Sequence, residues 1–268
     1  MGICAYCKKD RKLTREHIIP NFIYEYQKSI EGKYVGWNER AKKLLSSEGV
    51  IKDVCEDCNN VILGKLDASA SRMIKSAGVL TENFTEKTAT LDYNYSSLMR
   101  WLLKVSFNSA RAADNLAFRF KKYIPYILGK DPVDPDDVFV LVGLSMPDYI
   151  PDYELKELKD LYPNGNLPRN SEGLSHPFFV RVGWMPQFDE DFVIRVIVIG
   201  ALVFQIIIFI NNIELGKRRS KVKTWVKSAK GRQIVSAKRK SMVVTQLDQI
   251  YLETLEFQFE RLKMYDAV

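Results

Sequence analysis

The spacing of apolar residues predicts strands and a helix in the first third of the chain. An extended segment covers 13–19, and a second short run covers 50–54. After the second run, apolar residues recur every three or four positions, which predicts a helix that ends at Gly78. We therefore expect residues 1–80 to form one domain with the order strand, excursion (21–49), strand, helix.

Beyond residue 80 the pattern alternates between helix and strand. Residues 81–90 are polar and aperiodic, which predicts a linker, and helical spacing follows from about Asn94 toward Tyr126. Further strands are predicted at 138–144, at 178–183 and in two runs within 192–210, and further helices at 152–161 and 243–265. These elements predict a mixed helical and antiparallel-sheet domain over residues 81–268, and an α+β fold for the whole chain.

The most apolar stretch, Phe192 to Ile210, has about the length of a transmembrane helix. It also contains Arg195 and Gln205, and Gly200 separates two runs rich in Val and Ile. Because β-branched residues favour strands, we expect two buried strands here rather than a membrane span. A membrane-attached effector is the alternative interpretation of this stretch.

The amino-acid composition indicates a globular protein with an excess of positive charge. The 268 residues are 46% apolar and 27% charged, as in an ordinary globular protein, and the net charge of +7 suits a polyanionic partner. The chain opens Met-Gly-Ile-Cys, without the apolar segment of a signal peptide, which predicts a cytoplasmic protein. In that setting paired Cys-x2-Cys motifs indicate a metal site rather than disulfides.

The four cysteines of the chain form two such motifs, Cys4/Cys7 and Cys55/Cys58. Four thiolates are the ligand set of a closed tetrahedral zinc site. A closed shell has no position for water, so we expect a structural Zn²⁺ that pins two distant segments together.

Candidate catalytic residues lie between and directly after the two motifs. Glu16-His17 ends the first predicted strand, and Asn59-Asn60 follows the second cysteine pair. The pieces C-A-Y-C, T-R-E-H-I-I-P and V-C-E-D-C-N-N-V-I-L-G, in this order, resemble one branch of the HNH endonuclease superfamily. The resemblance covers residues 4 to about 67, roughly a quarter of the chain.

The resemblance implies an N-terminal zinc-stapled ββα-metal nuclease domain. His17 would activate water as general base, because imidazole is basic yet largely unprotonated at neutral pH. Glu16 and Asn59, with Asn60 as the alternative, would hold a catalytic Mg²⁺ or other divalent cation. Many relatives carry a further Asn shortly before the second cysteine pair, and this chain has none there. The orientation of the His17 ring is therefore open; the other histidine, His176, has no predicted role.

The segment Lys217–Lys240 holds eleven Lys or Arg residues in twenty-four, and no acidic residue lies between Glu214 and Asp248. Contacts with phosphates need charge more than sequence precision, so we expect this segment to bind nucleic acid. An acidic protein or an anionic lipid surface is the alternative. The candidate binding residues are Lys217, Arg218, Arg219, Lys221, Lys223, Trp225, Lys227, Lys230, Arg232, Lys238, Arg239 and Lys240.

The sequence thus predicts a metal-dependent endonuclease that hydrolyses phosphodiester bonds, with DNA as the expected substrate and RNA not excluded. Defence or a mobile element is the expected biological setting, and cleavage of both strands would suggest a homodimer. The rival interpretation is a noncatalytic, zinc-stabilised nucleic-acid-binding protein. Residues 81–268 carry no predicted role beyond the basic segment.

Overall fold

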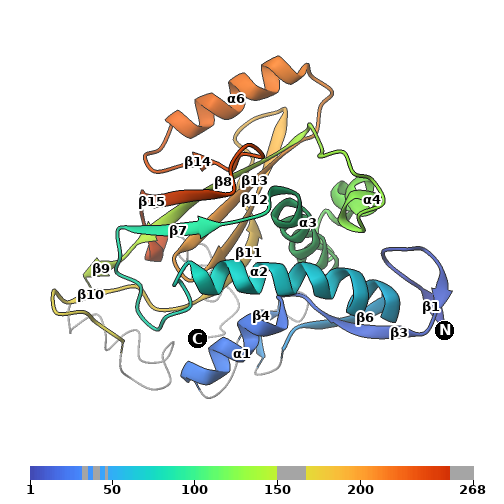
Figure 1. Cartoon of the computed structure of the whole chain (residues 1–268), viewed down its shortest axis with the longest axis horizontal. Helices are drawn as coiled ribbons and strands as arrows, with labels where there is room; N and C mark the ends of the chain where they lie inside the picture. Colours follow the sequence, from blue (N-terminus) through green and yellow to red (C-terminus); the bar gives the residue numbers. More distant parts are fainter. Residues whose placement is uncertain (32–35, 39–42, 46–47, 150–166, 254–268) are drawn as a thin grey trace. The chain divides into compact units, whose positions relative to one another are not determined.

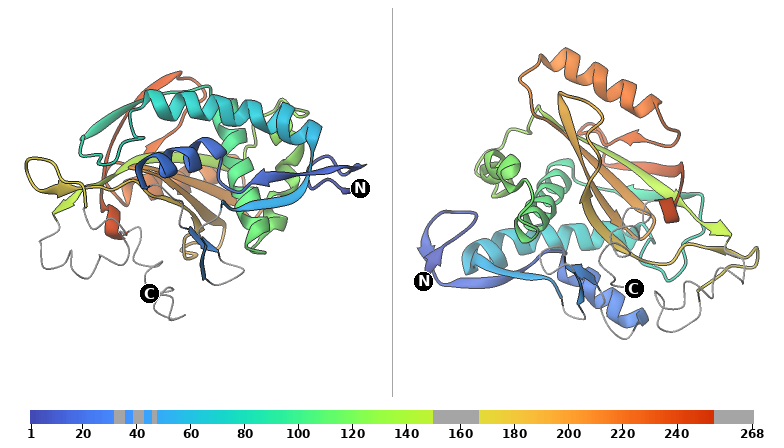
Figure 2. Two further views of the ribbon diagram at one scale, coloured as in Figure 1. Left: turned by 90° about the horizontal axis from the view of Figure 1, so that it is seen from below. Right: turned by 180° about the vertical axis from the view of Figure 1, so that it is seen from behind.

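The computed structural model describes residues 1–31, 36–38, 43–45, 48–149 and 167–253. The described residues form a mixed α+β protein with antiparallel and mixed sheets, which confirms the predicted fold class at that level (Figures 1 and 2).

The chain divides into two compact units, each assembled from segments distant in sequence. Unit 1 contains residues 1–74, 92–138 and 236–240, and unit 2 contains 75–91, 139–235 and 241–268. The sequence predicts a domain boundary between residues 80 and 81. The boundaries of the two compact units lie elsewhere in the chain. In particular, residues 92–138 belong with the cysteine motifs.

Unit 1 contains the strand, strand, helix order expected from the sequence. Strands β3 (Leu13–His17) and β6 (Val50–Cys55) pair antiparallel. The chain then makes a π-helical segment, η1 (Asp57–Leu63), which continues as α2 (Gly64–Ser76). The helix ends just before Gly78, as predicted, and the φ of +73° there is a left-handed conformation that glycine adopts without strain.

The excursion between β3 and β6 holds a helix that the apolar pattern does not predict. Helix α1 (Asn21–Glu31) buries Ile23, Tyr24 and Gln27. Tyr24 is amphipathic and Gln27 is polar. The run of apolar residues at helical spacing is therefore too short to indicate a helix. Two short antiparallel pairs complete this part of unit 1: β1 (Gly2–Ile3) with β2 (Asp10–Arg11), and β4 (Gly36–Asn38) with β5 (Lys43–Leu45).

Helix α3 (Tyr95–Ala112) is the longest helix among the described residues. The Asn94 side chain caps it by accepting a hydrogen bond from the Ser97 N–H at 2.9 Å. Helical structure continues, as predicted, through η2 (Ala117–Tyr123) and α4 (Ile124–Ile127). The middle of α3 is buried, including polar side chains that the site described below uses.

Unit 2 is a mainly antiparallel sheet with the strand order β11-β12-β13-β8-β15-β7, and β14 pairs with β8. Its elements are β7 (Thr88–Asp92), β8 (Val138–Met146), β9 (Asp148–Tyr149), β10 (Leu174–Ser175), β11 (Val180–Trp184), β12 (Phe192–Ile199), β13 (Leu202–Phe209), α6 (Leu215–Lys227), β14 (Gln233–Ile234) and β15 (Ser241–Ile250). Val222 of α6 packs with Phe192, Ile207 and Phe209, so this helix covers part of one face of the sheet (Figure 1).

The apolar stretch 192–210 forms the antiparallel hairpin β12–β13, which confirms the prediction of two buried strands. Gly200 makes the turn with a φ of +52°, and an added Cβ would lie 2.7 Å from the Val79 carbonyl oxygen. In the part of the chain that the structure describes, no helix is long and apolar enough to cross a membrane.

The predicted helix over 243–265 is wrong in its first part, because residues 241–250 form strand β15. Met242 and Val244 are buried while Ser241 and Val243 are exposed, a period of two typical of a strand. Pairing with β8 selects this conformation for a β-branched run whose apolar residues also fit a helical period. Residues 254–265 lie outside the described residues.

The predictions for four other segments also have outcomes. The predicted linker 81–90 is wrong at its end, because Thr88 already belongs to the edge strand β7, where Ala89 and Leu91 are buried in alternation. The predicted helix over 152–161 lies outside the described residues. The predicted strands at 138–144 and 178–183 are confirmed as β8 and β11.

His176, which has no predicted role, is fully buried in unit 2. Its Nε2 lies 2.8 Å from the Ser145 Oγ, and its ring packs 4.9 Å from the ring of Tyr251. Burial lowers the pKa of His176 from 6.5 to about 4, because the charged imidazolium loses its hydration. His176 is therefore a neutral core residue at physiological pH.

We expect unit 2 to lose stability as the pH falls from 6.5 to about 4. In this window the unfolded chain binds a proton at His176 and the folded chain does not, so the stability present above pH 6.5 declines by about 3 kcal/mol. Urea unfolding between pH 4 and 8 measures this loss, and His176→Gln is expected to flatten the profile. Ser145→Ala, which keeps the histidine, serves as the control. An unchanged slope in His176→Gln would contradict the prediction.

Candidate functional site

The two cysteine motifs meet in unit 1. Their four Sγ atoms all lie within 4.8 Å of one another, and the Cys7 and Cys55 Sγ atoms are 3.7 Å apart. Four sulfurs held at about 2.3 Å from one tetrahedral ion would be about 3.8 Å apart. The cluster therefore fits a structural metal ion such as zinc, as predicted.

Local backbone structure builds this cluster. Cys4 and Cys7 lie in the turn between β1 and β2, where the Lys8 N–H donates to the Cys4 carbonyl at 3.1 Å. Cys55 ends β6, and its N–H donates to the Cys4 Sγ at 3.3 Å. Cys4, Cys55 and Cys58 are buried, so a bound ion would be shielded from solvent and closed to substrate.

The pairing of β3 with β6 shifts register just before the candidate catalytic pair. Thr14 pairs with Val54, whereas Glu16 pairs with Ile51. Adjacent side chains on a regular strand point to opposite faces. A register shift disturbs this alternation, so the side chains near it need not point to opposite faces. The two residues nevertheless have very different surroundings.

His17 lies at the end of β3, and its side chain is 30% exposed. Its Nε2 lies 2.9 Å from Oε2 of Glu48. A carboxylate only accepts, so this contact places the ring hydrogen on Nε2 and leaves Nδ1 as the basic nitrogen. No described residue bonds to Nδ1.

Glu48 is a site residue that the sequence analysis missed. It accepts a hydrogen bond from Lys28 of α1 as well as from His17. Lys28 first, and His17 second, lower the pKa of Glu48, so it stays ionised. Glu48 lies two residues before β6, and no motif in the sequence singles it out. The contact with Glu48 orients the His17 ring, which the sequence alone does not determine.

Asn59 lies near the start of η1, and its amide nitrogen is held by the β3 segment. The Asn59 Nδ2 donates to Thr14 Oγ1 at 2.9 Å and to the Arg15 carbonyl oxygen at 2.8 Å. Both amide hydrogens are thereby used, which leaves Oδ1 as an acceptor. Asn60 is exposed and has no comparable anchor among the described residues.

Glu16 lies in a different environment, because it is only 3% exposed. Its Oε1 accepts from the Lys104 Nζ at 2.7 Å and from the Asn108 Nδ2 at 2.9 Å. Both donors come from α3. Oε2 has no donor among the described residues, so it is the carboxylate oxygen that the α3 donors leave open.

Lys104 is fully buried and bridges two carboxylates. Besides Glu16, it contacts Asp67 of α2 at 2.9 and 2.7 Å. Burial disfavours the charge on Lys104, but the Asp67 and Glu16 carboxylates outweigh that penalty and raise its pKa. The ammonium group therefore stays charged, in contact with the carboxylate predicted to bind a catalytic ion.

Asn108 connects the cysteine cluster with the candidate catalytic pair. Its Nδ2 donates to Glu16 and, at 3.1 Å, to the His17 carbonyl oxygen. Its Oδ1 accepts from the Tyr6 hydroxyl and from Arg111 Nη2, each at 2.6 Å. Tyr6 lies between Cys4 and Cys7, so one buried amide holds both parts of the site. No motif indicates this role, since Asn108 is 92 positions from Glu16 in the chain.

The predicted nucleic-acid-binding residues are divided between the two compact units. Residues 217–235 belong to unit 2 and residues 236–240 to unit 1. Some of these side chains have protein partners: Lys221 pairs with Asp189 and Asp191, and Arg218 is buried beside Asn212. Arg232 is half-buried and lies over the Trp225 ring. The exposed cations are Lys217, Arg219, Lys223, Lys227, Lys230, Lys238, Arg239 and Lys240.

Trp225 is occupied by its own surroundings. Its Nε1–H donates to Gln205 at 3.0 Å, and its ring contacts Arg232 at 4.3 Å and stacks on Phe188 at 5.7 Å. These contacts pack the Trp225 ring within unit 2, although the sequence predicts that this residue binds nucleic acid.

No family profile, no curated protein and no solved structure matches this chain. What the site does must therefore follow from its own residues.

Proposed function

We propose that the chain is a divalent-metal-dependent endonuclease of the HNH type, with His17 as general base. The observation that carries this proposal is the contact of His17 with Glu48 at 2.9 Å, at the end of the strand to which Asn59 is anchored. Glu48 fixes the tautomer and the ring, so Nδ1 is the nitrogen that would take a proton from water. The succession of β3, β6 and α2 around a cysteine cluster supports the same proposal.

Asn59 Oδ1 and Glu16 Oε2 are the oxygens that would hold the divalent ion. Oxygen ligands suit Mg²⁺, and the bound ion would stabilise charge on the phosphate and the leaving oxygen. Lys104 at Glu16 Oε1 reduces the negative charge of this pair. We therefore expect weak ion binding, which would tighten only with the phosphate of the substrate present.

Cleavage of plasmid DNA in Mg²⁺ tests the proposal. His17→Ala is expected to lower the rate about a hundredfold or more, because no described residue replaces the base. His176→Gln, which removes the other histidine of the chain, is the matched control and should cut normally. The proposal fails if the wild type nicks equally well after removal of Mg²⁺, or if His17→Ala cuts like the wild type. A parallel RNA substrate distinguishes the two nucleic acids.

One observation favours the rival function, a noncatalytic zinc-stabilised nucleic-acid-binding protein. Glu16 is buried in an ion pair with Lys104, a contact that a purely structural carboxylate would also make. Under this alternative the wild-type chain binds nucleic acid but leaves it intact at all Mg²⁺ concentrations. The cleavage assay therefore separates the two functions.

Affinity for nucleic acid would come from the exposed side of α6. Arg219, Lys223 and Lys227 follow one another at four-residue spacing and have no ion-pair partner among the described residues. We call these residues the α6 cation row. Side chains four apart lie on the same side of a helix, so the row presents three positive charges in line.

Neutralising the α6 cation row is expected to weaken DNA binding and to flatten its salt dependence. If each cation contacts one phosphate, Arg219→Gln/Lys223→Gln/Lys227→Gln lowers the slope of log K against log salt by roughly 2 to 3. Binding to duplex DNA at several salt concentrations measures the slope. The control exchanges three other exposed lysines, Lys75, Lys87 and Lys130, for Gln. Equal effects in both triple variants would show that only net charge matters.

A further inference from the structure

A cavity of about 480 Å³ lies in unit 1, where α3 begins. Residues 93–96 and Asp134 line it together with Ala237, Arg239 and Lys240, and all of them belong to the same compact unit. The volume is in the range of small-ligand sites. Neither the proposed catalytic residues nor the α6 cation row contributes to it.

Tyr93 fixes the segment 236–240 beside α3. The Tyr93 N–H donates to the Lys240 carbonyl oxygen at 2.8 Å. Its hydroxyl donates to the Ser236 carbonyl oxygen at 3.0 Å and accepts from the Ser236 N–H at 3.3 Å. These contacts join residues 143 positions apart in sequence. Specific hydrogen bonds therefore hold this wall of the cavity in place.

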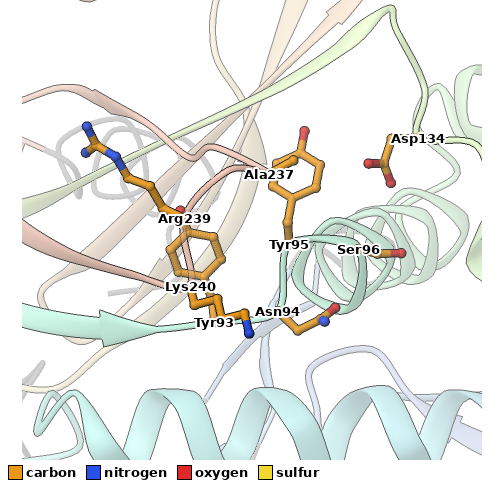
Figure 3. Close-up of a pocket in the computed structure, with 8 residues that line it drawn as sticks. All are labelled: Tyr93, Asn94, Tyr95, Ser96, Asp134, Ala237, Arg239 and Lys240. Carbon is orange, nitrogen blue, oxygen red and sulfur yellow. The ribbon is translucent and has the colours of Figure 1, made fainter.

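The two ends of the cavity differ in charge. Arg239 and Lys240 lie with Tyr93 on one side of the close-up, Asp134 and Ser96 lie on the other, and Tyr95 stands between them (Figure 3). Arg239 and Lys240 are exposed and have no ion-pair partner among the described residues.

The opposite end offers an acceptor and a donor. Asp134 Oδ1 accepts from the Tyr126 hydroxyl at 2.6 Å, which leaves Oδ2 for a further donor. Burial first, and the Asp134 carboxylate second, raise the pKa of Tyr95 to about 12, so its phenol stays protonated. A ligand that fits would be anionic at one end, flat and apolar in the middle, and rich in donors at the other.

We infer that this cavity binds a nucleotide, with the phosphate at Arg239 and Lys240 and the base beside Tyr95. Phosphate suits the two cations, and aromatic rings accept any base by stacking. The sugar hydroxyls or the base amino group would meet Asp134. If the bound nucleotide is part of a nucleic acid, the inference rests on the proposed function. The same chemistry also admits a free nucleotide.

Calorimetric titration of the full-length His17→Ala protein tests this inference without cleavage of the ligand. The probes are AMP, adenosine, inorganic phosphate and a ten-nucleotide oligo(dA) with a 5′-phosphate. We expect AMP or the oligonucleotide to bind at least about tenfold more tightly than adenosine or phosphate, because only a nucleotide uses both ends of the cavity. Binding of AMP identifies a free-nucleotide site, and binding of the oligonucleotide alone identifies a nucleic-acid site.

Arg239→Gln/Lys240→Gln is expected to weaken nucleotide binding about tenfold or more. Lys121→Gln/Lys130→Gln removes two other exposed lysines from unit 1 and should leave binding unchanged. Equal losses in both double variants, inorganic phosphate that binds as tightly as both AMP and the oligonucleotide, or no binding of any probe would overturn the inference. These outcomes are independent of the Mg²⁺ cleavage assay, so a failed nuclease proposal and a failed nucleotide site can be told apart.

Discussion

Removal of the metal ion from the cysteine cluster is expected to unfold the strand region of unit 1. Structural zinc contributes about 10–16 kcal/mol of binding free energy in small zinc domains, whereas whole domains are stable by about 5–15 kcal/mol. The four Sγ atoms lie within 4.8 Å of one another, so one ion would join the turn between β1 and β2 to the end of β6. We therefore expect the purified chain to contain one zinc per molecule, and Cys58→Ser to lose both the metal and the fold of β3 and β6.

Metal analysis, circular dichroism and limited proteolysis measure these losses together. Zinc added back after chelation should restore the wild type and not Cys58→Ser, which separates metal loss from irreversible damage. Unit 2 has its own apolar core and is expected to resist proteolysis in both samples. A zinc-free chain with an intact, protease-resistant unit 1 would contradict the prediction.

The cysteine cluster and its neighbouring elements could be predicted because their signals are local. Two Cys-x2-Cys motifs specify a metal site by their spacing alone, and alternating or helical patterns specify β6 and α2. The hairpin β12–β13 follows from β-branched composition in the same way. In each case the information lies within a few residues of the element that it predicts.

The remaining features depend on contacts between distant segments. Val243 and Val244 fit either a helix or a strand, and pairing of β15 with its sheet neighbours β8 and β7 decides between them. Glu48, Lys104 and Asn108 are ordinary polar residues in sequence and become part of the site through packing against β3. The sequence places Glu16 and His17 side by side, but it cannot show that one is buried in an ion pair and the other is half-exposed.

The ion pair of Glu16 with Lys104 makes a second large effect testable. Lys104→Met removes the ammonium group with little change in side-chain volume and leaves Glu16 and Asp67 without their cation. An uncompensated buried charge costs about 3–5 kcal/mol, so we expect unit 1 to lose that much stability in urea unfolding. Lys28→Met, which removes an exposed lysine from the pair with Glu48, should cost far less.

The combined variant Lys104→Met/Glu16→Gln/Asp67→Asn then separates the structural role of Glu16 from its proposed catalytic role. With no charge left in the buried cluster, most of the lost stability should return, because neutral amides carry a much smaller desolvation penalty. If Glu16 Oε2 also holds the divalent ion, stability returns and Mg²⁺-dependent cleavage does not. Cleavage restored together with stability would show that Glu16 serves only the fold, and that His17 and Asn59 act without it.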